Sequence, residues 1–260
     1  MTNKISIITA TYNAAETIHD CLECVKKQTV EVEHILVDGM SEDSTISIIK
    51  GYRDSVAHII SEPDKGIYDA MNKGLKLAGS DIIGILNADD FYPASDILAK
   101  VTHAFDNPKI DACYGDLLYV DGTNTEKIVR NWRSGSFSPE KFYWGWMPPH
   151  PTFFVRRSIY KKYGLFDMEL GSAADYEIML RFLVKHEIKA AYIPEVLVKM
   201  RTGGISNASV KNRLAANRMD RKAWAINDLK PYPWTLWMKP LRKVGQWIWK
   251  TKQQGAGCEK

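Results

Sequence analysis

The chain has 260 residues, of which 45% are hydrophobic and 25% are charged, a composition typical of a globular protein rather than a disordered or fibrous one. No apolar run reaches the roughly 18 residues that a membrane-spanning helix needs, and the N-terminal apolar stretch is too short for a signal peptide. Four cysteines in this length do not form a disulfide framework, so the sequence favours the cytoplasm. Cys21 and Cys24 have no partner pair and are expected to be structural thiols rather than zinc ligands.

The formal net charge of +4 hides an uneven distribution. The chain contains 35 Lys+Arg and 31 Asp+Glu. Residues 199–260 hold 14 of the basic and 3 of the acidic residues, which gives this segment a net charge of +11 and leaves residues 1–198 with −7. An acidic body with a basic C-terminal segment calls for a physical explanation.

The first hundred residues alternate between strand and helix patterns. Short apolar runs rich in β-branched residues predict strands buried on both faces, at 5–11, 33–38, 56–61 and 81–86. The intervening segments predict helices at about 14–27, 41–50 and 66–78, with Ser41 and Asp64 as expected caps. This order predicts an α/β fold with a mostly parallel central sheet, right-handed crossovers and helices on both faces.

The second half has a weaker pattern. Two strands, at 110–119 and 126–132, are predicted to form a hairpin around Asp121-Gly122. Residues 133–150 show little regular pattern but are rich in aromatic side chains. Such side chains suit sugar rings through apolar contacts, and they equally suit a core or an interface. A further helix is expected to begin at Ala173-Ala174-Asp175.

Acidic and polar residues follow the predicted strands, at the edge where ligands of parallel sheets bind. The fourth strand stops at Asn87-Ala88-Asp89-Asp90, and no glycine pattern of a dinucleotide fold or a P-loop is present. Adjacent carboxylates repel each other and need a cation or hydrogen-bond donors to stay ionised. Mg²⁺ or Mn²⁺ shared with a nucleotide diphosphate would supply that charge, and the alternative is a solvated turn that caps the next helix.

An ordered set of motifs covers about residues 4–206: SIITATYNA, LVDGMSEDST, EPDKGIYDAMNKGLKLAGSD, ILNADD, PHPTFFVRRSIYKKYGLFD, AADYEIMLR and GGIS. By these motifs the chain resembles the family 2 glycosyltransferases, whose Rossmann-like, nucleotide-sugar-binding fold is called GT-A. The resemblance implies a catalytic domain over 1–206, with a donor half over about 1–100 and an acceptor half over 101–206. A helical, basic, Trp-rich extension over 207–260 would follow. Similar proteins are bacterial enzymes that build lipopolysaccharide, capsule or exopolysaccharide.

The resemblance also implies which residues bind the donor. Thr9 and Tyr12 match the loop that holds the base, with Tyr12 placed to stack on uracil. Asp38 matches the acid that accepts a hydrogen bond from the pyrimidine ring, which favours uracil or thymine over cytosine; its alternative is a simple turn residue. Asn72 matches a residue that orders the donor pocket, or it lies on the helix surface. Asp89 matches the carboxylate near the ribose.

Two further acids match the reacting centre of the family. Asp90 matches the ligand of a Mn²⁺ or Mg²⁺ cofactor, and Asp175 matches the catalytic base. The family usually has Glu-Asp where this chain has Ala-Asp, and Glu177 is the runner-up base. Three residues of the aromatic region are expected near the acceptor: Trp144, Trp146 and His150.

The implied reaction is an inverting transfer of one sugar from a nucleotide-diphosphate sugar, with UDP expected and dTDP or GDP left open. The acceptor would be a hydroxyl of a lipid-linked, lipopolysaccharide or exopolysaccharide glycan. The Gln-x-x-Arg-Trp motif of processive synthases is absent from the sequence, so the transfer is predicted to be non-processive. The alternatives are a nucleotide-sugar-binding protein without catalysis and, less favoured, a sugar nucleotidyltransferase.

The C-terminal segment has an amphipathic helical pattern. Its apolar face contains Trp234, Trp237, Met238, Leu241, Val244 and Ile248. Its polar face contains Lys239, Arg242, Lys243, Gln246 and Lys250. The pattern predicts a helix within residues 230–250 lying on an anionic membrane surface, which would place the enzyme peripherally on the inner face of the cytoplasmic membrane. The alternative is packing on the body or on a second subunit in a homo-oligomer. Nucleic acid is not expected as a partner.

Overall fold

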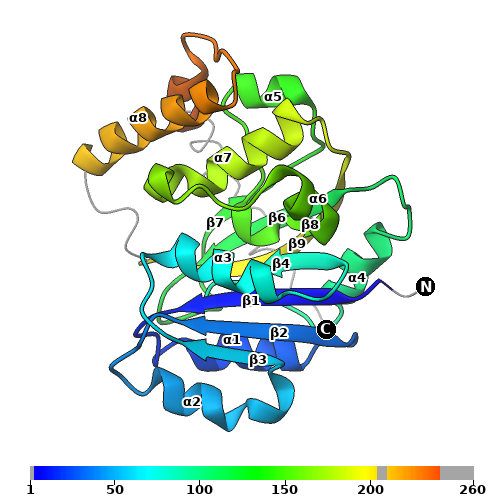
Figure 1. Cartoon of the computed structure of the whole chain (residues 1–260), viewed down its shortest axis with the longest axis vertical. Helices are drawn as coiled ribbons and strands as arrows, with labels where there is room; N and C mark the ends of the chain where they lie inside the picture. Colours follow the sequence, from blue (N-terminus) through cyan, green and yellow to red (C-terminus); the bar gives the residue numbers. More distant parts are fainter. Residues whose placement is uncertain (1–2, 204–209, 241–260) are drawn as a thin grey trace, which may run out of the picture.

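The computed structural model describes residues 3–203 and 210–240. Four parallel strands form the N-terminal half of the sheet: β1 (Ile5–Thr11), β2 (Val32–Asp38), β3 (His58–Ser61) and β4 (Ile82–Ile85). They are connected by α1 (Ile18–Lys26), α2 (Thr45–Gly51), the 3₁₀ turn η1 (Arg53–Ser55) and α3 (Ile67–Leu77). These elements confirm the predicted alternation, with small differences at their ends (Figure 1).

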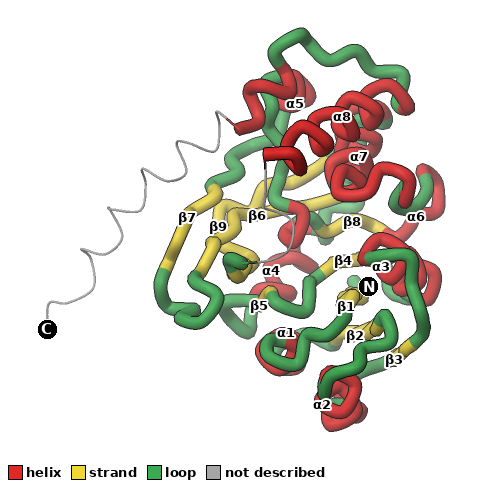
Figure 2. Tube along the Cα trace, turned by 90° about the vertical axis from the view of Figure 1, so that its left-hand side faces the viewer, coloured by secondary structure: helices red, strands yellow, loops and turns green. Residues whose placement is uncertain are grey.

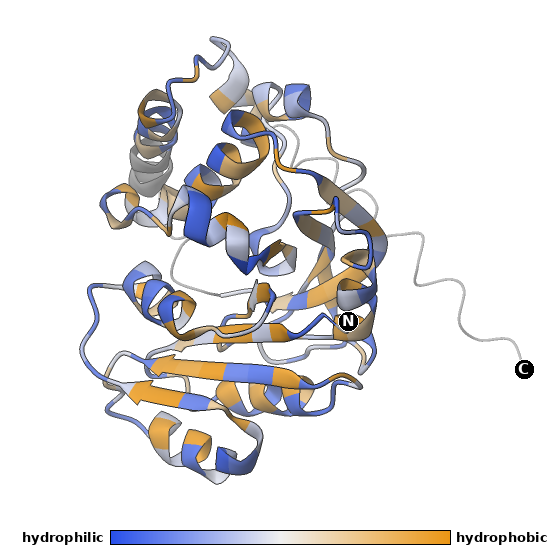
Figure 3. Cartoon of the chain, turned by 45° about the vertical axis from the view of Figure 1, so that its right-hand side comes forward, coloured by the Kyte–Doolittle hydropathy of each residue, from blue (hydrophilic) through white to orange (hydrophobic). Residues whose placement is uncertain are grey.

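Alternate residues of β1 face opposite layers of the core. Ile8 and Ala10 pack with the buried residues of α3, whereas Ile5 and Ile7 pack with those of α1. Helices therefore cover both faces of the sheet, as the strand pattern predicts. In Figure 3 the N-terminal strands are mostly hydrophobic, while the adjacent helices carry both hydrophobic and hydrophilic residues.

The second half of the sheet is mixed rather than parallel. It contains β5 (Asp90–Phe91), β6 (Ala112–Val120), β7 (Ile128–Trp132), β8 (Phe154–Arg156) and β9 (Ala190–Arg201). The order is β3-β2-β1-β4-β8-β6-β9-β5, with β7 paired to β6 (Figure 2). Among the described strands of this half, β6 and β9 pair in parallel, while β8, β7 and β5 pair antiparallel to their neighbours. The predicted hairpin of β6 and β7 is confirmed.

The remaining helices cover this half of the sheet. They are α4 (Ile97–Ala104), α5 (Pro139–Tyr143), α6 (Arg157–Tyr163), α7 (Ala174–Leu180) and α8 (Val210–Ile226), with the short turns η2 (His150–Thr152), η3 (Met168–Ala173) and η4 (Arg181–Lys185). The helix predicted to begin at Ala173 is α7. Both expected caps are wrong. Helix α2 begins after Ser44, and Ser41 instead bonds the carboxylate of Asp38. Helix α3 begins after Gly66, and Asp64 instead accepts a hydrogen bond from the N–H of Gly66 at 2.8 Å.

The C-terminal segment packs on the body as far as residue 240. Trp224 on α8 is fully buried, and its Nε1–H donates to the hydroxyl of Tyr176 on α7 at 2.8 Å. Thr235 and Leu236 are buried, and the Thr235 hydroxyl donates to the carbonyl of Tyr143 at 2.6 Å. The predicted apolar residues Leu241, Val244 and Ile248 and the polar residues Arg242, Lys243, Gln246 and Lys250 lie outside the described residues, as does the boundary at 206.

Lys239 departs from its predicted place on an outward polar face. Its ammonium lies 2.5 Å from the carboxylate of Asp220 and 3.6 Å from the centroid of the Tyr176 ring. The ion pair and the cation–π contact hold this side chain against α8 and α7. Lys239 therefore belongs to the contact between the C-terminal segment and the body.

Candidate active site

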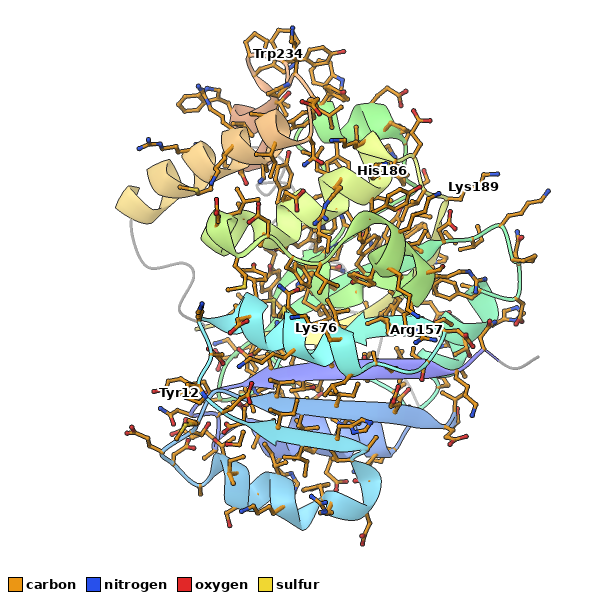
Figure 4. All side chains as sticks on the ribbon, viewed as in Figure 1. Tyr12, Lys76, Arg157, His186, Lys189 and Trp234 are labelled. Carbon is orange, nitrogen blue, oxygen red and sulfur yellow. The ribbon has the colours of Figure 1, made fainter. Side chains whose placement is uncertain are left out.

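The ends of β1 and β2 form a hydrogen-bonded edge. Asp38, the last residue of β2, is fully buried, and one of its oxygens accepts from the N–H of Ser41 at 3.0 Å and from the hydroxyl of Ser61 at 2.7 Å. Its other oxygen accepts from the Ser41 hydroxyl. Tyr12 follows β1, and its ring is 61% exposed at this edge (Figure 4). An exposed ring thus lies beside a fixed carboxylate.

Thr9 is buried within strand β1 and is not part of an exposed binding loop. Its side chain is fully buried, with the hydroxyl 3.0 Å from Nε2 of His34 and 3.7 Å from the Cys21 thiol. Thr11, two residues further along the same face, has a buried hydroxyl oxygen without a partner among the described residues. Thr11 is therefore better placed than Thr9 for a ligand contact, and the period of two along a strand could have indicated it.

Asp90 carries a buried and incompletely bonded carboxylate. One oxygen accepts from the side-chain amide of Asn87 at 3.0 Å, and the other has no hydrogen-bond partner in the described part of the chain. Burial raises the pKa of Asp90 well above its usual value, and the neighbouring charge of Asp89 raises it further. Burial also raises the pKa of Asp89, whose carbonyl accepts from Arg201 at 2.7 Å. A cation at Asp90 would stabilise its ionised form.

The donor set fits only certain metal ions. Among residues 3–203 and 210–240, no three His, Cys, Asp or Glu side chains gather in a way that could hold a metal. The described protein therefore offers one or two carboxylates, at Asp90 and Asp89. Mg²⁺ and Mn²⁺ accept such a partial set, because phosphate oxygens and water complete their coordination.

Asp175 lies at the start of α7, where its carboxylate accepts from the N–H of Tyr176 at 2.7 Å. Burial raises the pKa of Tyr68, and the negative charge of Asp175 raises it further. Burial lowers the pKa of His150, and the same charge opposes that shift. The ring of Phe166 packs against both Tyr68 and His150, at centroid distances of 5.4 and 5.8 Å. Asp175 therefore lies near both Tyr68 and His150.

Tyr119 on β6 lies near both Asp90 and Asp175. Burial raises the pKa of its phenol, and the charges of both Asp90 and Asp175 contribute to the shift. Tyr119 thus lies within electrostatic reach of both acids, although the three residues come from β5, β6 and α7. Tyr119 was missed by the sequence analysis, and no local motif marks it.

Asn72 orders the segment that leads to Asp175. Its amide donates to the carbonyl of Phe166 at 2.9 Å and accepts from the N–H of the same residue at 3.0 Å. The side chain is buried, so the reading as a helix-surface residue is wrong. Both amide groups are already bonded, which indicates a positioning role for Asn72.

The predicted acceptor residues separate into three environments. Trp146 is 6% exposed and donates from its indole to the carbonyl of Ser134 at 2.8 Å, so it is a core residue. Trp144 is 46% exposed and stacks near Trp234 of the C-terminal segment, with ring centroids 5.9 Å apart. His150 lies within electrostatic reach of Asp175, whose charge opposes the lowering of its pKa.

Glu177, the alternative base, is occupied elsewhere. Its carboxylate accepts from Arg181 at 2.9 Å and from the side-chain amide of Asn227 on the segment after α8 at 2.9 Å. The side chain is 3% exposed. Glu177 therefore joins α7 to the C-terminal segment and does not face solvent as a free base.

This α/β sheet, with acidic residues at the ends of its strands, has the fold of a GT-A glycosyltransferase. The family model described as "Glycosyl transferase family 2" matches residues 6–164. The chain belongs to this family and is a glycosyltransferase.

Curated relatives agree with this assignment. An uncharacterized glycosyltransferase of Mycobacterium tuberculosis is 31% identical over 183 residues, covering 68% of each chain. A PGL/p-HBAD biosynthesis glycosyltransferase of the same species is 30% identical over 212 residues, covering 79% of this chain and 80% of the relative.

Solved structures share the fold. Staphylococcus aureus TarS 1–349 in complex with UDP-GlcNAc has a TM-score of 0.66 and 19% identity, covering 88% of this chain and 67% of that one. The mannosyltransferase PcManGT from Pyrobaculum calidifontis, in complex with GDP-Man and Mn²⁺, has a TM-score of 0.64 and 20% identity, covering 92% and 73%. At such identities the likeness shows the fold alone.

Proposed function

We propose that the protein is an inverting, metal-dependent, non-processive glycosyltransferase that uses a UDP-sugar and a lipid-linked or polysaccharide acceptor. The observation that carries this proposal is that Tyr119 lies within electrostatic reach of both Asp90 and Asp175. One acid is buried with an unpartnered oxygen, as a metal ligand would be, and the other is partly exposed, as a base must be. TarS with UDP-GlcNAc and PcManGT with GDP-Man and Mn²⁺ support a nucleotide-sugar donor and a divalent ion.

The base of the donor would bind at the edge formed by Tyr12 and Asp38. The exposed ring offers a stacking face, and the Asp38 carboxylate accepts three hydrogen bonds from Ser41 and Ser61. A carboxylate has about four acceptor positions, so one is left for the N–H of a uracil ring. Gly39 lets Asp64 and the Tyr12 ring lie close to the backbone at this edge, because a Cβ at position 39 would be 2.5 Å from an Asp64 oxygen and 3.5 Å from the Tyr12 ring.

In the proposed reaction the acceptor hydroxyl oxygen attacks the anomeric carbon from the face opposite the leaving group. The new carbon–oxygen bond forms as the bond to the diphosphate breaks, the electron pair leaves with the nucleoside diphosphate, and the hydroxyl proton passes to Asp175. Such base catalysis contributes about 10²–10⁴-fold. A metal ion held by Asp90, with Asp89 beside it, would supply positive charge for the leaving diphosphate.

The first experiment measures nucleotide binding and transfer separately. Thermal shift with UDP, dTDP and GDP, each with and without Mn²⁺, identifies the nucleotide, and release of UDP in the presence of acceptor reports transfer. We expect Asp90→Asn to abolish the Mn²⁺-dependent shift and Asp175→Asn to keep the shift but lose transfer about 10²–10⁴-fold. Asp106→Asn, an exposed carboxylate, is the matched control. Wild-type transfer by Asp175→Asn would refute its role as the base.

We also propose that the enzyme associates peripherally with an anionic membrane. Four aromatic side chains gather where α5 meets the C-terminal segment, and we term them the aromatic tip: Trp144, Tyr232, Trp234 and Trp237. Each is at least 45% exposed, and Trp234 lies at one extremity of the molecule (Figure 4). Trp and Tyr are enriched at membrane interfaces, and residues 241–260 add five basic residues against one acid. No helix in the described residues is long and apolar enough to cross a membrane.

Liposome co-sedimentation tests the aromatic tip. Trp234→Ser with Trp237→Ser should lower binding to vesicles containing phosphatidylglycerol, while transfer to a soluble acceptor is retained. Tyr52→Ser, an aromatic change directly after α2 and distant from the tip, is the control. Unchanged vesicle binding by the double variant, or a dimer in solution that buries these tryptophans, would refute the membrane proposal.

A further inference from the structure

A row of paired residues crosses the sheet beside the candidate site. Asp90 on β5 pairs with Met200 on β9, Met200 pairs with Tyr119 on β6, and Tyr119 pairs with Arg130 on β7. Residues directly opposite each other on neighbouring strands point to the same face of a sheet. Arg130 therefore shares the face that carries the candidate metal ligand, about 14 Å away by three strand spacings.

The Arg130 side chain extends across the sheet in the direction of Asp90. Its central carbon lies 4.1 Å from the centroid of the Tyr119 ring, one strand nearer to Asp90, and 5.3 Å from that of Trp132. Asn131, the next residue, lines a hollow of about 310 Å³ with Asp116 and Tyr192, as expected from the alternation of side chains along a strand. Arg130 thus faces the site, and its neighbour faces away from it.

Two nitrogens of this guanidinium, Nε and Nη2, are buried without hydrogen-bond partners among the described residues. They are the two that lie along one edge of the group and donate in parallel. Burying charged donors without partners is unfavourable, and such groups in a folded protein call for an explanation. The parallel pair of N–H groups matches two oxygens of a phosphate, which a lysine ammonium cannot reproduce.

We propose that Arg130 binds phosphate oxygens of a bound substrate through its Nε and Nη2 edge, which makes it a specificity-determining residue of the transferase. The proposal rests on the proposed function, since the phosphate is either the diphosphate of the donor or a phosphate of the acceptor. Both sources present the same chemistry to the guanidinium. The guanidinium lies over the ring of Tyr119, whose phenol is influenced by the charges of both Asp90 and Asp175, and this position serves either source.

Three variants test the proposal. Arg130→Gln removes the charge, Arg130→Lys keeps the charge but lacks the parallel donors, and Lys127→Gln removes an exposed charge from the same hairpin as a control. Thermal unfolding without ligand shows whether each variant folds. Calorimetric titration with UDP and with uridine, both with Mn²⁺, forms the donor arm. Titration with farnesyl phosphate in the presence of saturating UDP forms the acceptor arm.

We expect Arg130→Gln and Arg130→Lys to weaken binding about ten- to a hundredfold in one arm, and Lys127→Gln to leave both unchanged. Weaker UDP binding with unchanged uridine binding assigns the donor diphosphate, and weaker farnesyl phosphate binding assigns the acceptor. Unchanged affinities in both arms, or full affinity in Arg130→Lys, would overturn the proposal. If the wild-type protein binds no nucleotide, the proposed function fails instead, so the two failures are distinguishable.

Discussion

Replacement of Glu177 by alanine separates a structural role from a catalytic one. The carboxylate is 3% exposed and pairs at 2.9 Å with Arg181, whose side chain is 15% exposed. Removing one partner of a buried ion pair costs about 3–5 kcal/mol, because the other charge loses its compensation. Arg181 keeps its bonds to the carbonyls of Tyr163 and Leu165, both at 2.6 Å. We therefore expect Glu177→Ala to lower the free energy of unfolding by about 3 kcal/mol, the lower end of this range.

Urea unfolding followed by circular dichroism measures this loss. Asp175→Asn, two residues away and partly exposed, should change the free energy of unfolding by less than about 0.5 kcal/mol. Combining Glu177→Leu with Arg181→Met should recover much of the stability, because an apolar pair leaves no buried charge. If Glu177→Ala unfolds like the wild type but loses transfer, Glu177 is the catalytic base and the assignment of Asp175 is refuted.

Three further substitutions test the structure. Asn72→Ala removes both bonds to the Phe166 backbone and should lower stability by about 1–3 kcal/mol and kcat with it, whereas an unchanged kcat would contradict the positioning role. His34 is buried with its pKa lowered to about 3, so the unfolded chain takes up a proton below about pH 6.5 and the folded one does not. Stability should therefore fall by up to about 1.4 kcal/mol per pH unit between pH 6 and 4, and His34→Gln, compared by urea unfolding, should weaken this slope. Gly74→Ala would place a Cβ 2.4 Å from the Ile8 side chain and should cost about 1–3 kcal/mol in the same assay, so a wild-type midpoint would contradict the packing.

The first half of the fold was predictable because its signals are local. Strand β1 matches its predicted range of 5–11, and the predicted β2 differs by one residue. Continuous β-branched runs are needed wherever helices cover both faces of a sheet, and each run is followed by its own connecting helix. The alternation therefore predicts four parallel strands, whereas the pairing of β4 with β1 instead of β3 is not contained in this pattern.

The second half depends on contacts between distant segments. Strand β8 has only three residues and inserts antiparallel between β4 and β6, which no local pattern indicates. Strand β9 contains Pro194 and is irregularly paired with β6, so its apolar pattern is interrupted. The parallel β6–β9 pair and the antiparallel β5 arise from this long-range packing.

The candidate site was likewise predictable where its signals are local and not where they depend on distant contacts. Motifs located the acids at the strand ends, because their spacing along the chain is local. They did not show that the Thr9 hydroxyl points to His34 or that Trp146 is buried. Tyr119 and Arg130 were missed because their places depend on pairing across β6, β7 and β9.

The contact of α8 with α7 has a practical consequence for shortening the chain. A protein cut at residue 206 would lose Trp224 from its buried site, Asn227 from the Glu177 carboxylate and Lys239 from the Tyr176 ring. All three touch helix α7, which carries Asp175 in its first turn, so the candidate base would stand on an unsupported element. A soluble enzyme for crystallisation should therefore extend at least to residue 240 and gain its solubility from substitutions at Trp234 and Trp237.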